Sequence, residues 1–310
     1  MNVLITSLSR KVSLAKEVKK VLGETNQLFG MDQDPDVVGK YFVDEFFVQE
    51  DYLYQTPETL LKFCLDHEIQ AIIPTRNGEL PFFSKLQSFF EEHGIHIMVS
   101  KLETVNTCLD KWAFFQTLKE IATLPQTALD INRIEAEYLV VKERFGAGSD
   151  KLLQKASLRQ AKSWGDHLKN PLYQTMIQGR EYSVDLYFTR QGRYHGGIVR
   201  ERVSVERGES KVTQSVHHPS LLRASETVGE TLLFAYHVVM QWIEEEHTGD
   251  LYLIECNPRF GGASNLSLNL GLHSIGWFFQ EIQGVPLSPF QRVTEEKCLV
   301  RYPEDRIFDV

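Results

Sequence analysis

Short apolar runs alternate with amphipathic segments along the first hundred residues. Val3 to Thr6 is an apolar run, and a polar segment from Ser7 to Lys11 follows it. Leu14, Val18 and Leu22 then recur with the spacing of one helix face, up to a helix end at Gly23. The same patterns predict further strands at 27–31, 71–73 and 95–99, and helices that begin at Thr56-Pro57 and span 80–92. Alternating strands and helices predict a parallel, doubly wound sheet.

The pattern changes near residue 101. A helix is predicted from about Asp110 to Ile121, and Pro125 interrupts the chain after it. The strands predicted beyond this point have few helices between them, and they cover 138–142, 173–177, 182–189, 195–205, 238–244 and 251–256. Turns at Gln191-Gly192 and Thr248-Gly249-Asp250 favour antiparallel pairing. We therefore expect an α+β second part, packed closely on the first because no flexible linker separates them.

Composition excludes several classes of protein. The 310 residues suffice for about two domains, and 33 basic against 42 acidic residues give a net charge of -9, opposite in sign to a nucleic-acid-binding protein. No apolar stretch approaches the roughly 18 residues of a membrane-spanning helix. The four cysteines lie far apart in the sequence, without a CxxC pair or the spacing of metal ligands, at Cys64, Cys108, Cys256 and Cys298. We therefore expect them to be reduced thiols in a cytoplasmic protein.

A small-residue loop follows a predicted strand that ends in lysine. Val140-Val141-Lys142 ends the strand, and Phe145 to Ser149 follows with two glycines. Glycine lets backbone N–H groups approach a phosphate closely, and the lysine places a positive charge beside it. An ordinary hairpin turn explains the same residues, and the order of a Walker A motif is absent.

A second group of polar residues lies at the end of the 251–256 strand. Alternate residues of a strand share a face, so Glu255, Asn257 and Arg259 are predicted to point into one site. Gln241 precedes Glu255 by 14 residues, and a hairpin between them would make the two neighbours across the strand pair. Oxygen ligands with a guanidinium suit Mg²⁺ and phosphate. The alternatives are an Asn-Pro turn and, for Gln241, a surface side chain.

Two further strands carry candidate binding residues. The segment Gln178 to Asp185 places Glu181 after a backbone hinge, where a carboxylate can accept from ribose hydroxyls. Arg200 and Arg202 share one face of the 195–205 strand and could hold a carboxylate. A solvated strand face is the alternative for both.

Taken together and in this order, these elements resemble the ATP-grasp superfamily, most of all its carbamoyl-phosphate-synthase-like carboxylate-amine ligases. The resemblance covers nearly the whole chain, with further matches at Leu4 to Ser7, Pro74 to Glu79 and Asp110-Lys111. It implies a Rossmann-like α/β pre-ATP-grasp domain over 1–100. An α+β ATP-grasp domain of two lobes that clasp ATP would then cover 101–310, with the mobile lid lobe at approximately 112–175.

The resemblance also implies residue roles. Catalytic roles fall to Arg259, Lys142 and Arg202. The implied phosphate contacts are Lys111, Lys142 and the lid loop with Gly146, Gly148 and Ser149. The implied adenine contacts are the hinge residues Gln174, Met176 and Ile177. Glu181 would bind the ribose, and Lys211 is a further implied nucleotide contact. One or two Mg²⁺ ions, with Mn²⁺ as a substitute, would bind Gln241, Glu255 and Asn257. Substrate contacts fall to Arg10, Arg76, Asn77, Glu79 and Arg200.

The implied activity is transfer of a phosphoryl group from ATP to a carboxylate, giving an acyl phosphate that an amine attacks. Small-molecule acid and amine are the implied partners, in a homodimer and without nucleic acid or membrane. The chain departs from carbamoyl phosphate synthase because it holds one synthetase half, lacks a glutaminase arrangement, and carries Gly261-Gly262, which would leave room for a bulkier substrate. The alternative function is a nucleotide-binding sensor or partner subunit without ligase activity. A dehydrogenase is excluded because no GxGxxG follows the first strand.

Overall fold

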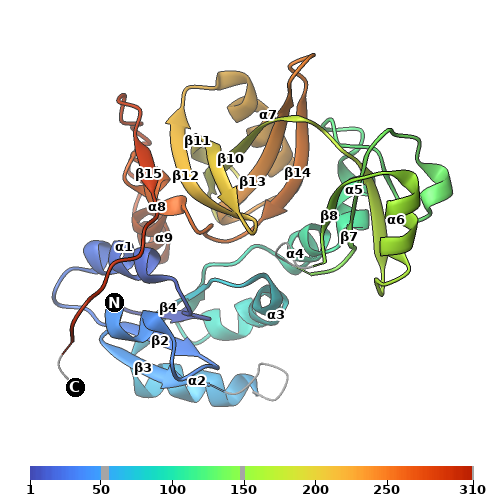
Figure 1. Cartoon of the computed structure of the whole chain (residues 1–310). Helices are drawn as coiled ribbons and strands as arrows, with labels where there is room; N and C mark the ends of the chain where they lie inside the picture. The colour runs from blue at the N-terminus through green and yellow to red at the C-terminus, as the bar shows by residue number, and fades with distance from the viewer. Residues whose placement is uncertain (50–55, 147–150, 309–310) are drawn as a thin grey trace.

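The N-terminal part of the computed structural model, which describes residues 1–49, 56–146 and 151–308, is built on a parallel five-stranded sheet (Figure 1). Its strand order is β3-β2-β1-β4-β5. The elements are β1 (Asn2–Thr6), α1 (Val12–Leu22), β2 (Leu28–Asp32), η1 (Val38–Phe42), β3 (Glu45–Val48), α2 (Pro57–Asp66), β4 (Ile69–Pro74), η2 (Asn77–Glu79), α3 (Leu80–Glu91) and β5 (His96–Ile97). The predicted α/β domain with a parallel sheet is confirmed.

Local signals in the sequence set the ends of these helices. Gly23 ends α1 with a φ of 69°, a conformation that costs glycine little, and its N–H donates to the carbonyl of Lys19. The Thr56 side chain accepts from the N–H of Thr59, and Pro57 opens α2, as the sequence predicts.

Two helices lead from this domain to a lobe with its own small antiparallel sheet. They are α4 (Leu102–Leu109) and α5 (Lys111–Leu118). The sheet has the order β6-β9-β7-β8, and the lobe comprises β6 (Thr127–Ala128), η3 (Ile131–Arg133), β7 (Leu139–Glu143), β8 (Leu153–Ala156), α6 (Leu158–Gly165) and β9 (Pro171–Thr175). We call it the lid lobe. Figure 1 shows it in green, beside the other two parts.

The rest of the chain forms an antiparallel six-stranded sheet of order β14-β13-β10-β11-β12-β15. Its elements are β10 (Gly179–Phe188), β11 (Tyr194–Glu206), β12 (Glu209–Val216), α7 (Pro219–Thr231), β13 (Tyr236–Glu245), β14 (Leu251–Asn257), α8 (Ser264–Leu268), α9 (Ser274–Ile282) and β15 (Cys298–Val300). We call this part the core lobe. Together the two lobes confirm the predicted α+β class of the second part.

Helices α6 and α7 were not predicted from the sequence. The buried face of α7 carries Leu221, Ser225, Val228 and Gly229, so two of its four inward positions are not hydrophobic. Gly229 is required there because a Cβ would lie 1.9 Å from the ring of Phe188. Apolar periodicity therefore fails to mark a helix that packs through small residues.

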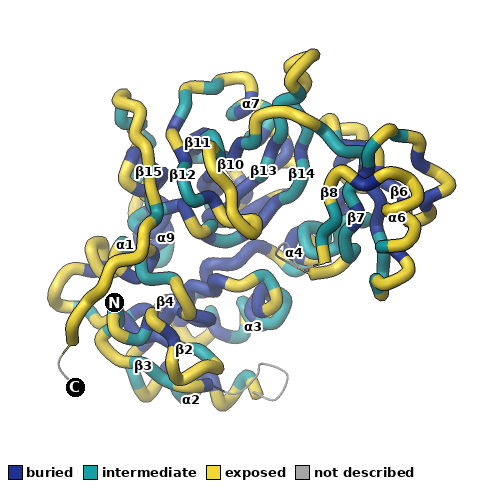
Figure 2. The backbone as a smooth tube through the Cα atoms, in the orientation of Figure 1, coloured by how far each residue is buried: buried dark blue, intermediate teal, exposed yellow. Residues whose placement is uncertain are grey.

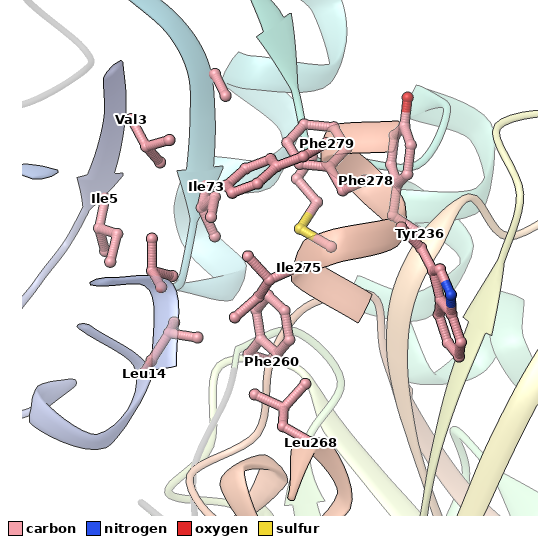
Figure 3. Packing of buried hydrophobic residues seen from close by; sticks show 14 of the residues in the cluster. Val3, Ile5, Leu14, Ile73, Tyr236, Phe260, Leu268, Ile275, Phe278 and Phe279 are labelled. Atoms are coloured by element: carbon pink, nitrogen blue, oxygen red, sulfur yellow. The ribbon is translucent and has the colours of Figure 1, made fainter. Parts of the chain in front are cut away.

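One hydrophobic core joins the N-terminal domain to the core lobe. Val3, Ile5 and Ile73 pack with Phe260 and Ile275, although some 200 residues of sequence separate the two groups. Figure 3 shows these side chains meeting between the two parts, and Figure 2 shows buried backbone continuing through the contact. The expectation that the parts pack closely is confirmed.

The cysteines lie in apolar surroundings or at the surface. All four are free, with Cys64 and Cys256 buried and Cys298 exposed. Burial raises the pKa of Cys64 to about 12, so this thiol stays protonated at neutral pH. Among the described residues no helix is long and apolar enough to cross a membrane.

Candidate active site

A cavity of about 950 Å³ is lined by all three parts of the chain. Its lining carries four glutamates, Glu143, Glu181, Glu209 and Glu255, against nine cationic side chains. The acidic protein therefore surrounds this cavity with net positive charge, as a site for a polyanion requires. The cations are Lys11, Lys111, Lys142, Lys151, Arg200, Arg202, Arg207, Arg259 and Arg301.

Lys142 and Lys111 enter the cavity from the lid lobe and from the start of α5. The ammonium of Lys142 donates to Oε1 of Gln174 on the neighbouring strand β9 (2.9 Å), and that of Lys111 donates to the carbonyl of Gly146 (2.9 Å). Burial lowers the pKa of Lys142 to about 8, against the attraction of Glu255, and burial also lowers the pKa of Lys111. Both ammonium groups thus lack full solvation, and their contact with phosphate oxygens stays a prediction.

The loop after β7 is tied to the start of α5. Asp110 accepts from the N–H groups of Trp112 and Ala113, and its carboxylate pairs with Arg144 at 2.5 Å. Burial opposes ionisation, but the Arg144 and backbone hydrogen bonds outweigh it and lower the pKa of Asp110. Strands β7 and β8 pair antiparallel, and Gly146, which follows β7, has a φ of 110°. Gly148 and Ser149 lie outside the described residues.

The predicted hairpin brings the candidate metal ligands together. Gln241 on β13 is directly opposite Glu255 on β14, and both line the cavity with Asn257. Nδ2 of Asn257 donates to Oε1 of Glu255 (2.8 Å). Oδ1 of Asn257 accepts from Nδ2 of Asn77 (2.8 Å) and so points away from Glu255. The Asn257 carboxamide must rotate by half a turn before its Oδ1 can bind a cation beside Glu255.

This donor set suits a hard cation. One carboxylate and two carboxamides provide only oxygen ligands, and Mg²⁺ typically takes one or two carboxylates together with phosphate oxygens and water. In the described part of the chain no group of three or more His, Cys, Asp or Glu residues forms a metal cluster. The oxygen ligands of Gln241, Glu255 and Asn257 fit Mg²⁺, and its binding here stays a prediction.

Arg259 lies at the junction of the core lobe and the N-terminal domain. Its Nε donates to Oδ1 of Asn77, which follows β4, and its Nη1 donates to the carbonyl of Phe260 (2.8 Å). Burial lowers the pKa of Arg259 from a very high ordinary value, and Glu255 opposes the shift. The structure thus brings the predicted residues Asn77, Asn257 and Arg259 into one hydrogen-bonded group.

The hinge residues and the predicted ribose acid also line the cavity. Gln174, Met176 and Ile177 lie at and after the end of β9. Glu181 pairs with Nε of Arg202 at 3.0 Å, and Arg202 also donates to the carbonyl of Gly208 (3.0 Å). A carboxylate can accept several hydrogen bonds, so Glu181 retains acceptor capacity while Arg202 holds it.

Four predicted residues are not brought to the cavity. Arg10 and Arg76 are exposed at the surface of the N-terminal domain, and Lys211 pairs with Glu206 at 3.7 Å outside the lining. Glu79 is fully buried, where its carboxylate accepts from the hydroxyl of Ser7 and from two backbone N–H groups, so it stabilises the loop after β4. The sequence pattern shows that these residues are charged but not where their partners lie.

Arg200 reaches the cavity lining but is held in a buried ion pair. Its Nε donates to Asp185 at 2.5 Å, and both residues are almost completely buried. Asp185 also accepts from Ser264 and Ser267, and the Ser264 hydroxyl in turn accepts from the N–H of Gly261 (2.8 Å). The network therefore supports the loop after Arg259. Substrate binding by Arg200 is not supported by this arrangement.

We expect Asp185→Asn to lower the free energy of unfolding by about 3–5 kcal/mol, because it leaves the buried Arg200 charge unpaired. Burial opposes ionisation, but Arg200 and a hydrogen bond with His237 hold the pKa of Asp185 well below its usual range. Its contribution is therefore complete above about pH 4 and is lost as the pH falls. Urea denaturation at pH 7 measures the change, and a loss below about 1 kcal/mol would contradict it. Asp185→Leu with Arg200→Met, which removes both charges, is the control.

Four cations of the cavity lining, Lys11, Lys151, Arg207 and Arg301, are not among the candidate residues predicted from the sequence. Lys11 precedes α1, and Arg301 follows the last strand, β15. The Arg301 side chain fills the space beside Gly262. A Cβ atom on residue 262 would lie only 2.5 Å from Nη2 of Arg301. Gly261 and Gly262 both line the cavity, so the expectation that they leave room for a bulkier substrate stays a prediction, with the Arg301 side chain in the space at Gly262. Only the long-range pairing of β15 with β12 brings Arg301 here, and the local sequence carries no signal for it.

Family models match both parts of the chain. The model described as ATP-grasp domain matches residues 108–263, which is half of the chain, and that described as PylC-like, N-terminal domain matches residues 3–98. The chain belongs to the ATP-grasp family. The predicted superfamily is thus confirmed, and the narrower likeness to carbamoyl phosphate synthase stays a prediction. A search of curated proteins finds no match to this ATP-grasp protein.

Solved structures share the fold of this ATP-grasp protein at low sequence identity. The biotin carboxylase domain of Hydrogenobacter thermophilus 2-oxoglutarate carboxylase, a dimer in complex with MgADP, ADP and bicarbonate, gives a TM-score of 0.76 at 15% identity, over 96% of this chain and 73% of that one. N5-carboxyaminoimidazole synthetase from Staphylococcus aureus complexed with ADP gives a TM-score of 0.73 at 14% sequence identity, over 93% of this chain and 78% of that one. L-amino acid ligase from Bacillus licheniformis gives a TM-score of 0.67 at 15% sequence identity, over 91% of this chain and 73% of that one.

Proposed function

We propose that this chain is an ATP-dependent ligase that joins a carboxylate to an amine. The observation that carries the proposal is the convergence of Lys111, Lys142 and Arg259 on Glu255 in one cavity. Family membership supports ATP as the phosphoryl donor. Similar structures named as carboxylase, synthetase and ligase, the first two with ADP among their bound molecules, support the same class of chemistry.

The proposed reaction has two steps. A carboxylate oxygen attacks the γ-phosphorus, the bond to the β-γ bridging oxygen breaks, and ADP leaves. The amine nitrogen then attacks the acyl carbon of the acyl phosphate, phosphate leaves, and the nitrogen loses a proton, which gives an amide. The triphosphate and the carboxylate repel each other, so the main task of the protein is to neutralise and align them.

The side chains have distinct tasks in this proposal. Lys142 and Lys111 bind phosphate oxygens, while Gln174 holds the ammonium of Lys142 in place. Gln241, Glu255 and Asn257 would hold Mg²⁺, which supplies charge neutralisation at the transferred phosphoryl group. Arg259, oriented by Asn77, points its guanidinium to the same group. The loop that contains Gly146 closes over the phosphates and excludes water from the acyl phosphate.

Release of ADP from ATP tests the function. The purified protein with Mg²⁺ and ATP is screened against pairs of small carboxylic acids and amines, and product masses identify the bond formed. We expect ADP release to require both an acid and an amine. A protein that binds ATP but releases no ADP with any pair would instead be a nucleotide-binding sensor or partner subunit. Size-exclusion chromatography of the same sample tests the proposed homodimer.

A further inference from the structure

Three cations from distant segments line the end of the cavity that contacts the N-terminal domain. Lys11 comes from the loop between β1 and α1, Arg259 follows β14, and Arg301 follows β15. Lys111 and Lys142, which serve the phosphates in the proposed function, belong instead to α5 and the lid lobe. The positive charge of this end is thus additional to the phosphate-binding pair.

Lys11 carries an uncompensated charge. Within the part of the chain that the structure describes, its ammonium makes no hydrogen bond and no ion pair. Burial lowers its pKa to about 8, and the charge of Arg259 acts in the same direction. Lys11 is half-buried, and an ammonium that lines a cavity without a partner of its own is available to bind an anion.

The carboxylates near Lys11 are already occupied. Glu79 accepts from Ser7 and from the N–H groups of Thr75 and Arg76, and Glu209 accepts from Nη1 of Arg301 at 3.0 Å. Each attracts Lys11 only through space. The protein therefore supplies no dedicated counter-ion to this lysine.

Arg301 is fixed in position beside this charge. Its N–H donates to the carbonyl of Lys211 (2.9 Å), its guanidinium lies against Gly262, and Glu209 holds Nη1. Held in this way, Arg301 loses little side-chain entropy when it binds a ligand. A fixed guanidinium and a free ammonium at one cavity end are suited to a carboxylate or phosphate group.

We propose that Lys11 and Arg301 bind a second anionic group of the acid substrate, so that this site selects small acids with two negative groups. The inference rests on the proposed function, in which Arg259 and the metal serve the phosphoryl group that is transferred to the first carboxylate. The second group is a carboxylate or a phosphate, which share the chemistry that these cations recognise.

Calorimetry with three acids of matched backbone tests the proposal on protein saturated with Mg²⁺ and ADP. Butyrate carries one anionic group, succinate carries a second carboxylate, and 3-phosphonopropionate carries a phosphonate in its place. We expect succinate or the phosphonate to bind at least 10-fold more tightly than butyrate. The tighter of the two identifies the second group.

Variants assign the preference to residues. Lys11→Gln and Arg301→Gln should each remove most of the 10-fold preference, while Lys11→Arg should retain it. Lys20→Gln on α1 and Arg223→Gln on α7 remove exposed cations outside the cavity and should leave the preference unchanged. Equal binding of all three acids by the unaltered protein, or an undiminished preference in Lys11→Gln, overturns the proposal. If Lys11→Gln does not fold, Arg301→Gln and the unaltered protein decide.

ADP release separates this proposal from the function on which it rests. If acids with one negative group support ADP release as well as those with two, the ligase function stands and the selectivity is wrong. If acids with two negative groups bind through Lys11 without any ADP release, the anion site stands and the ligase function is wrong.

Discussion

Glu255→Gln is expected to reduce ADP release by at least about 10³-fold, the largest effect of any substitution in the cavity. Glutamine keeps the shape of the side chain but removes the one carboxylate among the three candidate Mg²⁺ ligands, and with it the negative charge that faces Lys111, Lys142 and Arg259. The nucleotide would then bind without an aligned metal. Initial rates at saturating Mg²⁺ and ATP measure the loss, and Glu255→Ala should lose as much.

The control for this prediction lies on the same hairpin. Glu246 is exposed at the turn between β13 and β14, far along the strands from Glu255, so Glu246→Gln should keep full activity. Thermal melting should show that both variants are folded. Turnover of Glu255→Gln within about tenfold of the unaltered protein would refute the assignment of Glu255 to the metal.

Lys142→Met is expected to reduce ADP release by about 10²–10³-fold and to raise the KM for ATP. The methionine keeps the length of the side chain but cannot neutralise a phosphate. Because burial holds the pKa of Lys142 at about 8, folding opposes the charged form, and removing it should not lower the melting temperature. Loss of activity with unchanged or higher thermal stability separates a binding role from a structural one; Lys142→Ala should be equally inactive.

Lys162→Met provides the comparison for this lysine. Lys162 is exposed on α6 of the same lobe, outside the cavity lining, so its replacement should alter neither the rate nor the KM. Activity of Lys142→Met near that of Lys162→Met would contradict the assignment.

The residues that the sequence identified best are those fixed by local geometry. The face shared by Glu255 and Asn257 follows from the alternation of β14, and the 241–255 pairing follows from one short turn, whereas Arg259 lies two residues beyond the end of this strand. Both features depend on neighbours within a few residues or one hairpin, so a pattern of residue types suffices to place them.

The residues whose surroundings the sequence did not reveal depend on partners far along the chain. Glu79 and Arg200 are charged and adjoin candidate motifs, yet Ser7 and Asp185 hold them in buried hydrogen bonds. Arg301 enters the cavity only because β15 pairs with β12 across more than 80 residues. A sequence pattern gives the charge of such residues, whereas tertiary pairing decides whether that charge is free.

The lid lobe contains a hydrophobic core of its own, with Leu139, Val141 and Tyr173 among its members, whereas the N-terminal domain and the core lobe share one. Opening the lid lobe therefore exposes little of the apolar surface that stabilises the rest of the chain. In native-state hydrogen exchange we expect the amides of β7 and β9 to exchange as one cooperative unit, at a lower free energy than those of β1 and β13. The unit with the lowest free energy of opening would then also contain Lys142. Binding of a nucleotide should therefore slow hydrogen exchange most at the amides of β7 and β9.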